Sequence, residues 1–258
     1  MLGAIIGDIV GSRFEFNNTS DFDFELFTSA CDYTDDSICT FAVADAILSC
    51  KPYEDAMLAW CRKYPYPMGS YGGSFSRWIH SANPQPYNSF GNGSAMRVSA
   101  VGWLHDTEEE VLEQAKLSAE ITHNHPEGIK GAQAVALAIY LCRKGMCKEA
   151  MLEELKRYYP TFVEPKLGQN AFNETCQGTL PICLGIIEKA TNFEEAIRYA
   201  IAVGGDSDTI GAIVGSMAEA LWGIPEEIRA KAIEYLPAEM VEVYTIFLKR
   251  RSHKVFKK

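Results

Sequence analysis

The chain has 258 residues, of which 47% are hydrophobic and 22% charged, so it is long enough to bury a hydrophobic core without disulfide or metal staples. Its formal net charge of -10 excludes the broad basic surface that non-specific nucleic-acid binding requires, although it allows a nucleotide-like small ligand. The eight cysteines form no CxxC pair, and several lie in apolar helical segments, which favours reduced thiols in an intracellular protein.

The N-terminal segment does not have the pattern of a secretory signal peptide, because it lacks a basic start and meets Asp8 early. The longest apolar stretch, residues 131–142, is too short to cross a bilayer. We therefore expect a soluble, cytoplasmic protein without a membrane partner. The sequence leaves its oligomeric state open.

The first expected helix, residues 2–12, carries glycine at every fourth position: Gly3, Gly7 and Gly11. These residues share one helix face, and a row of glycines there indicates that another backbone packs very close. Asp8 is then a carboxylate inside a tightly packed region. Two interpretations stay open for it: a buried cap on a neighbouring helix, or a residue that supports a ligand site.

Helical periodicity continues through most of the chain. We expect helices from residue 34 to about 50, then over residues 53–63, 75–80, 107–122, 128–144, 148–158, 174–188 with an interruption at Pro181, 193–203, 210–221, 226–235 and 238–249, and one that follows residue 94. Sustained strand alternation with hairpin turns is missing from the sequence. The prediction is a compact all-α domain over residues 1–258, with about ten helices.

Two short clusters combine carboxylates with hydroxyls at predicted helix starts, residues 34–37 (Thr-Asp-Asp-Ser) and 206–209 (Asp-Ser-Asp-Thr). One such residue suffices for a helix N-cap, but each cluster carries four. Neighbouring carboxylates repel one another unless a cation neutralises them, and oxygen ligands suit Mg²⁺ or Mn²⁺ better than zinc. The clusters therefore favour two halves of one metal site over two plain caps.

A glycine- and asparagine-rich loop, residues 89–97, precedes an apolar helix and is a candidate cradle for a diphosphate. A plain turn with an N-cap is the alternative. His123 and His125 follow a predicted helix end, where a histidine is either a favourable cap or a ligand contact. The sequence contains neither a P-loop nor a Gly-x-Ser-x-Gly nucleophile elbow.

Taken in order, five segments resemble the ADP-ribosylglycohydrolase family, which includes the ADP-ribosylarginine hydrolases and the dinitrogenase reductase-activating glycohydrolase. The matching segments are residues 7–12 with Glu15, then 33–37, 90–97, 122–123 and 204–211. The resemblance implies an orthogonal multi-helix bundle with a central pair of Mg²⁺ ions, or Mn²⁺ in their place. Its substrate would be an ADP-ribosylated protein or a small-molecule ADP-ribose derivative.

The resemblance also implies roles for individual residues. The expected metal ligands are Thr34, Asp35, Asp36, Asp206, Asp208 and Thr209; the expected substrate contacts are Ser89, Phe90, Gly91, Asn92, Gly93 and His123. Glu15 and Asp36 are the candidate catalytic carboxylates. The implied reaction is hydrolysis at ribose C1 with release of ADP-ribose.

Two other functions remain as alternatives: a two-metal phosphoester hydrolase that uses the same carboxylates, and a non-catalytic ADP-ribose-binding relative. The loops around residues 64–88 are compact for the family, so the identity of the acceptor is left open. Residues 160–175 are expected to line one side of the pocket, although they contain no recognisable motif.

Overall fold

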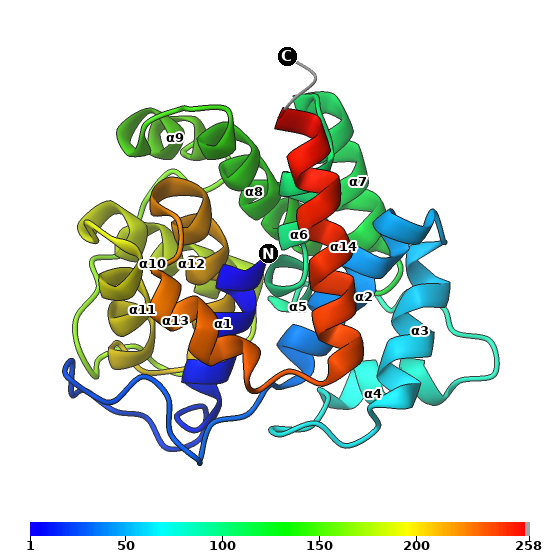
Figure 1. Ribbon diagram of the computed structural model, residues 1–258, viewed down its shortest axis with the longest axis horizontal. Helices are drawn as coiled ribbons and strands as arrows, with labels where there is room; N and C mark the ends of the chain where they lie inside the picture. Colours follow the sequence, from blue (N-terminus) through cyan, green and yellow to red (C-terminus); the bar gives the residue numbers. More distant parts are fainter. Residues whose placement is uncertain (256–258) are drawn as a thin grey trace.

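Helices make up most of residues 1–255, the part of the chain that this computed structural model describes (Figure 1). The helices are α1 (Leu2–Ser12), α2 (Asp35–Ser49), α3 (Tyr53–Lys63), α4 (Gly73–His80), α5 (Gly93–Met96), α6 (Ser99–Leu104), α7 (Glu108–Glu120), α8 (Pro126–Arg143), α9 (Lys148–Leu155), α10 (Cys176–Lys189), α11 (Phe193–Ala202), α12 (Ser207–Trp222), α13 (Glu226–Ile233) and α14 (Ala238–Val255). The all-α prediction is confirmed, and the described helices number fourteen rather than about ten. Extended pairing in this part of the chain is limited to two isolated β-bridges.

Local sequence signals explain several helix boundaries. Thr107 and Glu110 form the expected capping box at the start of α7. Pro181 does not interrupt α10, contrary to the prediction: the helix runs through it. The carbonyl that loses its amide donor there is that of Gln177, an exposed residue, so water can satisfy it.

The first helix is buried on all sides and crosses α12 with backbone in contact with backbone. A Cβ atom added at Gly3 would lie 2.1 Å from the Gly215 carbonyl oxygen, and one added at Gly7 would lie 1.9 Å from that of Gly211. A Cβ at Gly11 would lie 2.6 Å from the Asp208 Cα. The expected close approach at the glycine row is confirmed, with α12 as the partner.

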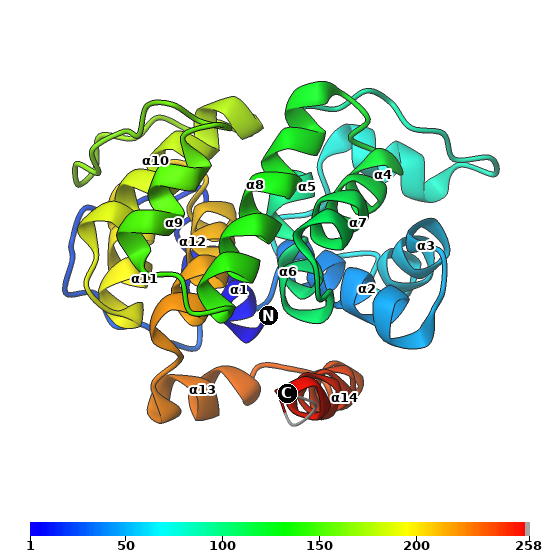
Figure 2. The same cartoon turned by 90° about the horizontal axis from the view of Figure 1, so that it is seen from above.

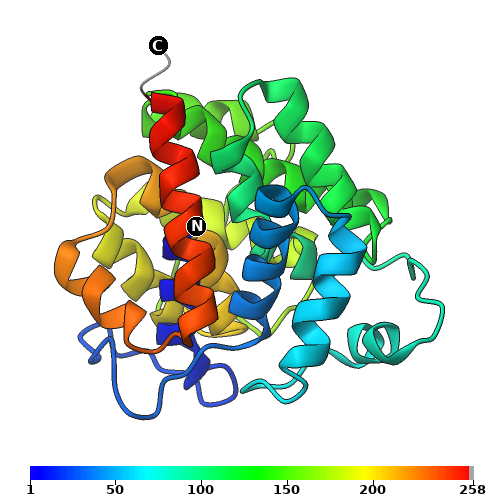
Figure 3. The same ribbon diagram turned by 45° about the vertical axis from the view of Figure 1, so that its right-hand side comes forward.

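Seen from above, α13 and α14 form a layer along one side of the bundle, while α8 runs through its middle (Figure 2). Turning the molecule shows α14 in front, with the antiparallel pair of α2 and α3 beside it (Figure 3). No helix in the described range 1–255 is both long enough and apolar enough to cross a membrane.

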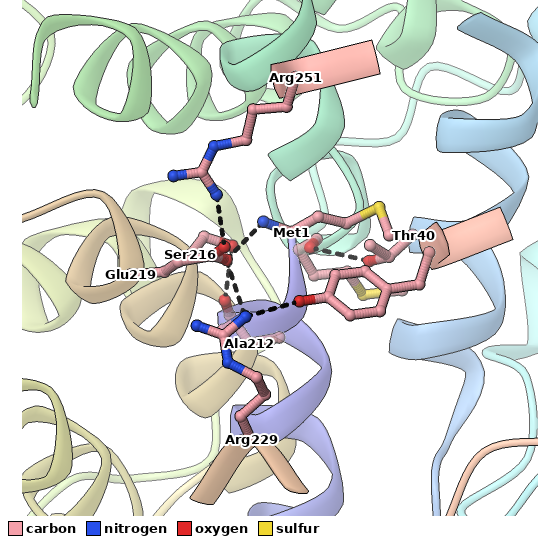
Figure 4. Close-up of polar contacts among 10 residues, drawn as sticks. Met1, Thr40, Ala212, Ser216, Glu219, Arg229 and Arg251 are labelled. Carbon is pink, nitrogen blue, oxygen red and sulfur yellow. Dashed lines mark hydrogen bonds and ion pairs between the residues drawn. The ribbon is translucent and has the colours of Figure 1, made fainter. Parts of the chain in front are cut away.

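The amino group of Met1 is buried beneath α14, where it forms an ion pair with Glu219 (Figure 4). It lies 2.5 Å from Glu219 Oε2 on α12, and the amide of Gly3 donates to the same oxygen over 2.8 Å. Arg251 on α14 approaches the other carboxylate oxygen of Glu219 to 3.6 Å. Glu219 thus joins three helices at the end of the molecule where α1 begins.

Candidate active site

A cavity of about 610 Å³ opens between the N-termini of α2 and α12 and the loops at residues 69–75, 87–93 and 172–175. This volume lies within the roughly 300–1,000 Å³ that small-molecule sites commonly have. Thr34 is the one residue of the predicted site that does not line the cavity. The predicted residues that line it are Glu15, Asp35, Asp36, Ser89, Phe90, Gly91, Asn92, Gly93, His123, Asp206, Asp208 and Thr209.

The two carboxylate clusters meet in this cavity. The hydroxyl of Thr209, at the start of α12, donates a 3.2 Å hydrogen bond to Asp36 Oδ2 at the start of α2. Glu15, Asp206 and Asp208 each place a carboxylate oxygen so that the three atoms lie within 4.8 Å of one another. Segments more than 170 residues apart in the chain therefore build one acidic group, and Glu15 belongs to it.

Burial and mutual repulsion act on these carboxylates together. Burial, then the nearby carboxylates, raise the pKa of Asp35, Asp36 and Asp208 well above the usual value. One oxygen of Asp36 and one of Asp208 are buried without a hydrogen-bond donor among the described residues. A bound cation would relieve both the repulsion and the missing contacts, and an all-oxygen donor set fits Mg²⁺ or Mn²⁺.

Asp8 anchors the start of α2, as the first of the two interpretations left open for it expects. Its Oδ2 accepts 3.0 Å hydrogen bonds from the amides of Thr34 and Ser37 and a further one from the Ser37 hydroxyl. Its Oδ1 accepts from the Thr34 hydroxyl over 2.6 Å. Asp8 is thus the buried cap of a neighbouring helix, and it fixes the turn that presents Asp35 and Asp36.

Thr34 is fully buried, and its hydroxyl acts as the N-cap of α2 by accepting from the amide of Asp36 over 3.2 Å. The same hydroxyl donates to Asp8. A hydroxyl has one proton and two lone pairs, so one lone pair of Thr34 remains. Its expected role as a metal ligand stays a prediction.

The loop of residues 89–93 lines the same cavity as the acidic group. Asn92 connects the two, because its side-chain amide donates to Asp206 Oδ2 over 2.7 Å and to Thr179 Oγ1 over 3.1 Å. The backbone amide of Asn92 donates to the Glu174 carbonyl over 2.7 Å. Asn92 therefore braces a carboxylate of the acidic group, and substrate contact through its remaining oxygen is still a prediction.

Several cavity residues were not found by sequence reasoning. The segment 160–175 does line one side, as expected, through Phe172, Glu174 and Thr175. Phe16 is 75% exposed and stacks on Phe172 with ring centroids 6.3 Å apart. The available signal was an aromatic residue directly after Glu15 in a polar loop, but neither periodicity nor a motif marks such a position.

A family model described as ADP-ribosylglycohydrolase matches residues 1–250. The chain belongs to this family. It is 24% identical to ADP-ribosylhydrolase ARH3 of Homo sapiens, an alignment that covers 100% of this chain and 93% of that protein. It is 25% identical to ADP-ribosylarginine hydrolase Tri1 of Pseudomonas putida, over 87% of this chain and 70% of that protein.

The fold is also shared with solved structures. A chain of an ADP-ribosylglycohydrolase-related protein complex superposes with a TM-score of 0.76 at 22% identity, covering 97% of this chain and 95% of that one. Family membership and fold thus agree with the resemblance that the five sequence segments carry. Membership of this family, whose relatives named above are ADP-ribosylhydrolases, makes the protein an enzyme of the glycosyl hydrolase type.

Proposed function

We propose that this protein is a Mg²⁺-dependent hydrolase that cleaves the bond between ribose C1 of an ADP-ribosyl group and its acceptor, and so releases ADP-ribose. The acceptor is a side chain of an ADP-ribosylated protein or a small molecule. The observation that carries the proposal is that Asp36 and Asp208, each with one buried carboxylate oxygen that lacks a hydrogen-bond donor among the described residues, line the same cavity as the glycine-rich loop. We also propose that the enzyme acts in the cytoplasm, as the sequence predicts.

Two half-sites would hold the metal ions: Asp35 and Asp36 with Thr34 on α2, and Asp206, Asp208 and Thr209 at α12. Ions held by these residues would supply Lewis-acid chemistry, lowering the pKa of a water molecule and helping to orient the ribose hydroxyls. The number of two ions and the choice of Mg²⁺ over Mn²⁺ are part of the proposal.

Glu15 has the properties of a proton carrier at this site. It is half-buried, and burial followed by the charge of Asp206 raises its pKa to about 7. In the metal-free protein its carboxyl group is therefore able to hold or release a proton near neutral pH, and bound cations would lower this pKa. Its place beside Asp206 and Asp208 makes it the candidate to deprotonate water or to protonate a departing acceptor. Asp36, the other catalytic candidate, would stabilise the positive charge that develops at ribose C1 during departure.

The opposite side of the cavity would receive the diphosphate and the base. The glycines of residues 89–93 let this part of the loop pack against His123, because a Cβ at Gly91 or Gly93 would lie 3.4 or 3.2 Å from its Nε2. Phe90 is 43% exposed, and its ring is tilted against the ring of His125 with the two centroids 5.2 Å apart. It therefore offers a face on which an adenine ring can stack. His123 lines the same cavity.

The test combines chelation with one substitution. Asp208→Asn should abolish Mg²⁺-restored hydrolysis of an ADP-ribosylated arginine or serine peptide, a loss above the roughly 10–100-fold that outer contacts to a metal typically cost. Because the substitution removes one of several repelling carboxylates, the metal-free variant should melt no lower than the wild type, which separates loss of the site from loss of the fold. Asp55→Asn, in the exposed first turn of α3, is the matched control and should retain full activity.

Product analysis distinguishes the alternatives. Release of ADP-ribose supports the proposal, whereas AMP or inorganic phosphate would identify a phosphoester hydrolase. Tight binding of ADP-ribose without turnover of any linkage would identify a non-catalytic relative. Full activity of Asp208→Asn after chelation and Mg²⁺ addition would refute the assigned metal site.

A further inference from the structure

Arg97 follows the glycine-rich loop at the end of α5 and lines the cavity, although only 1% of it is exposed. Its Nη2 donates to the Ser118 carbonyl over 3.0 Å and to Thr122 Oγ1 over 2.9 Å. A guanidinium group donates hydrogen bonds but accepts none. The direction of the contact between Arg97 and Thr122 is therefore fixed: the hydroxyl oxygen accepts.

The Thr122 hydroxyl then needs an acceptor for its own proton. Thr122 is fully buried, and its oxygen lies 2.7 Å from Nδ1 of His123. Within the described part of the chain, the hydroxyl contacts Arg97 and this nitrogen. If Nδ1 carried a proton, two donors would point at one oxygen and the hydroxyl proton would be buried without an acceptor, which is costly. The satisfied arrangement has the hydroxyl donating to a bare Nδ1, so the ring proton of His123 sits on Nε2.

Nε2 points into the glycine-rich loop. Cβ atoms added at Gly91 and Gly93 would lie 3.4 and 3.2 Å from it. In the same loop, the amides of Ser89, Gly91 and Asn92 already donate to other protein oxygens. The loop therefore has fewer free backbone N–H groups than its sequence suggests. The Nε2–H group of His123 adds a side-chain donor there.

The ring is also held neutral. Burial, with a contribution from the positive charge of Arg97, lowers the pKa of His123 well below its usual value. The other ring that approaches it, that of Tyr87 at 6.1 Å between centroids, has a pKa raised by burial to about 12 and is therefore uncharged as well.

We propose that Arg97 and Thr122 are positioning residues that lock His123 as the Nε2–H tautomer, so that it donates one hydrogen bond to a phosphate oxygen of the ligand in the glycine-rich loop. The part of this inference that concerns the ligand rests on the proposed function, whereas the tautomer is a property of the free protein. A histidine held in this way binds an anion with constant strength across neutral pH, because it neither changes charge nor exchanges its donor for an acceptor.

The first measurement is made on the free protein. Long-range ¹H–¹⁵N spectra of imidazole nitrogens, with His123 assigned from the signals that His123→Gln removes, should show a protonated Nε2 and a bare Nδ1 from about pH 6 to pH 8. In Thr122→Val, which keeps the shape of the side chain but lacks the hydroxyl, the ring should show mixed tautomers or titrate in this range. Thr122→Ser, which keeps the hydroxyl, should restore the wild-type spectrum.

The second measurement is the affinity for ADP-ribose by calorimetry. Thr122→Val should bind at least about tenfold more weakly, as expected for a lost hydrogen bond to a charged oxygen, and Thr122→Ser should bind within about twofold of the wild type. An Nδ1–H tautomer or a charged ring in the wild type would overturn the proposal, as would unchanged affinity in Thr122→Val. The expected tautomer in a wild type that fails to bind ADP-ribose would refute the proposed function and the ligand contact while upholding the lock.

Discussion

Replacing Gly7 by alanine tests the backbone contact on which the site is built. The added Cβ would lie 1.9 Å from the carbonyl oxygen of Gly211 and 2.1 Å from its carbonyl carbon. Both atoms belong to the backbone of α12, so no side chain can rotate away to relieve the overlap. The two helices would have to separate by about 1.5 Å, the difference between 1.9 Å and an ordinary contact of 3.4 Å.

The expected loss of stability follows from two opposing terms. Alanine is favoured over glycine within a helix by about 1 kcal/mol. Overpacking a rigid core site costs about 1–3 kcal/mol and sometimes more, and this contact has no flexible partner. The two terms leave a net loss of up to about 2 kcal/mol, and we expect the upper end because the contact is between two backbones. For a chain of this length, such a loss lowers the melting temperature by roughly 4–8 °C.

Urea and thermal unfolding of metal-free protein measure this loss, and the affinity for Mg²⁺ should fall with it, since Asp8 and Asp208 move apart with their helices. Gly72→Ala is the control: its Cβ meets nothing within 4 Å, so we expect a change within about 0.5 kcal/mol. A Gly7→Ala protein as stable as the Gly72→Ala protein would show that α1 and α12 are not in backbone contact.

Two further predictions concern Met1 and Glu15. Burial lowers the pKa of the Met1 ammonium from 8.0 to about 6, so this group contributes stability that is present above pH 8 and falls as the pH drops toward 6. Glu219→Gln removes the paired carboxylate, so its deficit in unfolding free energy should grow below about pH 6; a deficit that stays constant in urea titrations down to about pH 5.5 would contradict the pairing. Gly69 has φ +78°, and a Cβ there would lie 2.5 Å from Glu15 Oε2. Gly69→Ala should therefore displace this carboxylate and reduce kcat/KM by about 10–100-fold. Equal activity in Gly69→Ala and Gly72→Ala would refute the contact.

The fold was predictable to the extent that helical periodicity and glycine spacing report it. Gly3, Gly7 and Gly11 indicated a close helix contact, and the structure gives α12, through Gly211 and Gly215, as the partner. Short helices such as α5 and α6 escaped separate prediction because four to six residues give too little periodicity. Pro181 was misjudged because the freed carbonyl reaches water, which depends on exposure rather than on local sequence.

At the site, motifs predicted which residues lie together but not which hydrogen bonds each of them makes. Asn92 stood in a loop read as a ligand cradle, yet its amide braces Asp206. Arg97 stood at the end of the loop predicted to cradle a diphosphate, and its link through Thr122 to His123 depends on α7 ending beside the loop. Contacts between segments that are distant in sequence leave no periodic trace in either one.

The first helix determines whether the two halves of the acidic group can meet at all. On one face, Gly7 and Gly11 bring its backbone against α12, so the position of Asp208 follows that of α1. Asp8, between these glycines, holds the first turn of α2 through four hydrogen bonds, so the position of Asp36 follows α1 as well. The repulsion among the carboxylates opposes their approach. The backbone contact at the glycines and the buried cap at Asp8 hold the carboxylates together, whereas no ion pair from a described Lys or Arg reaches Asp36 or Asp208.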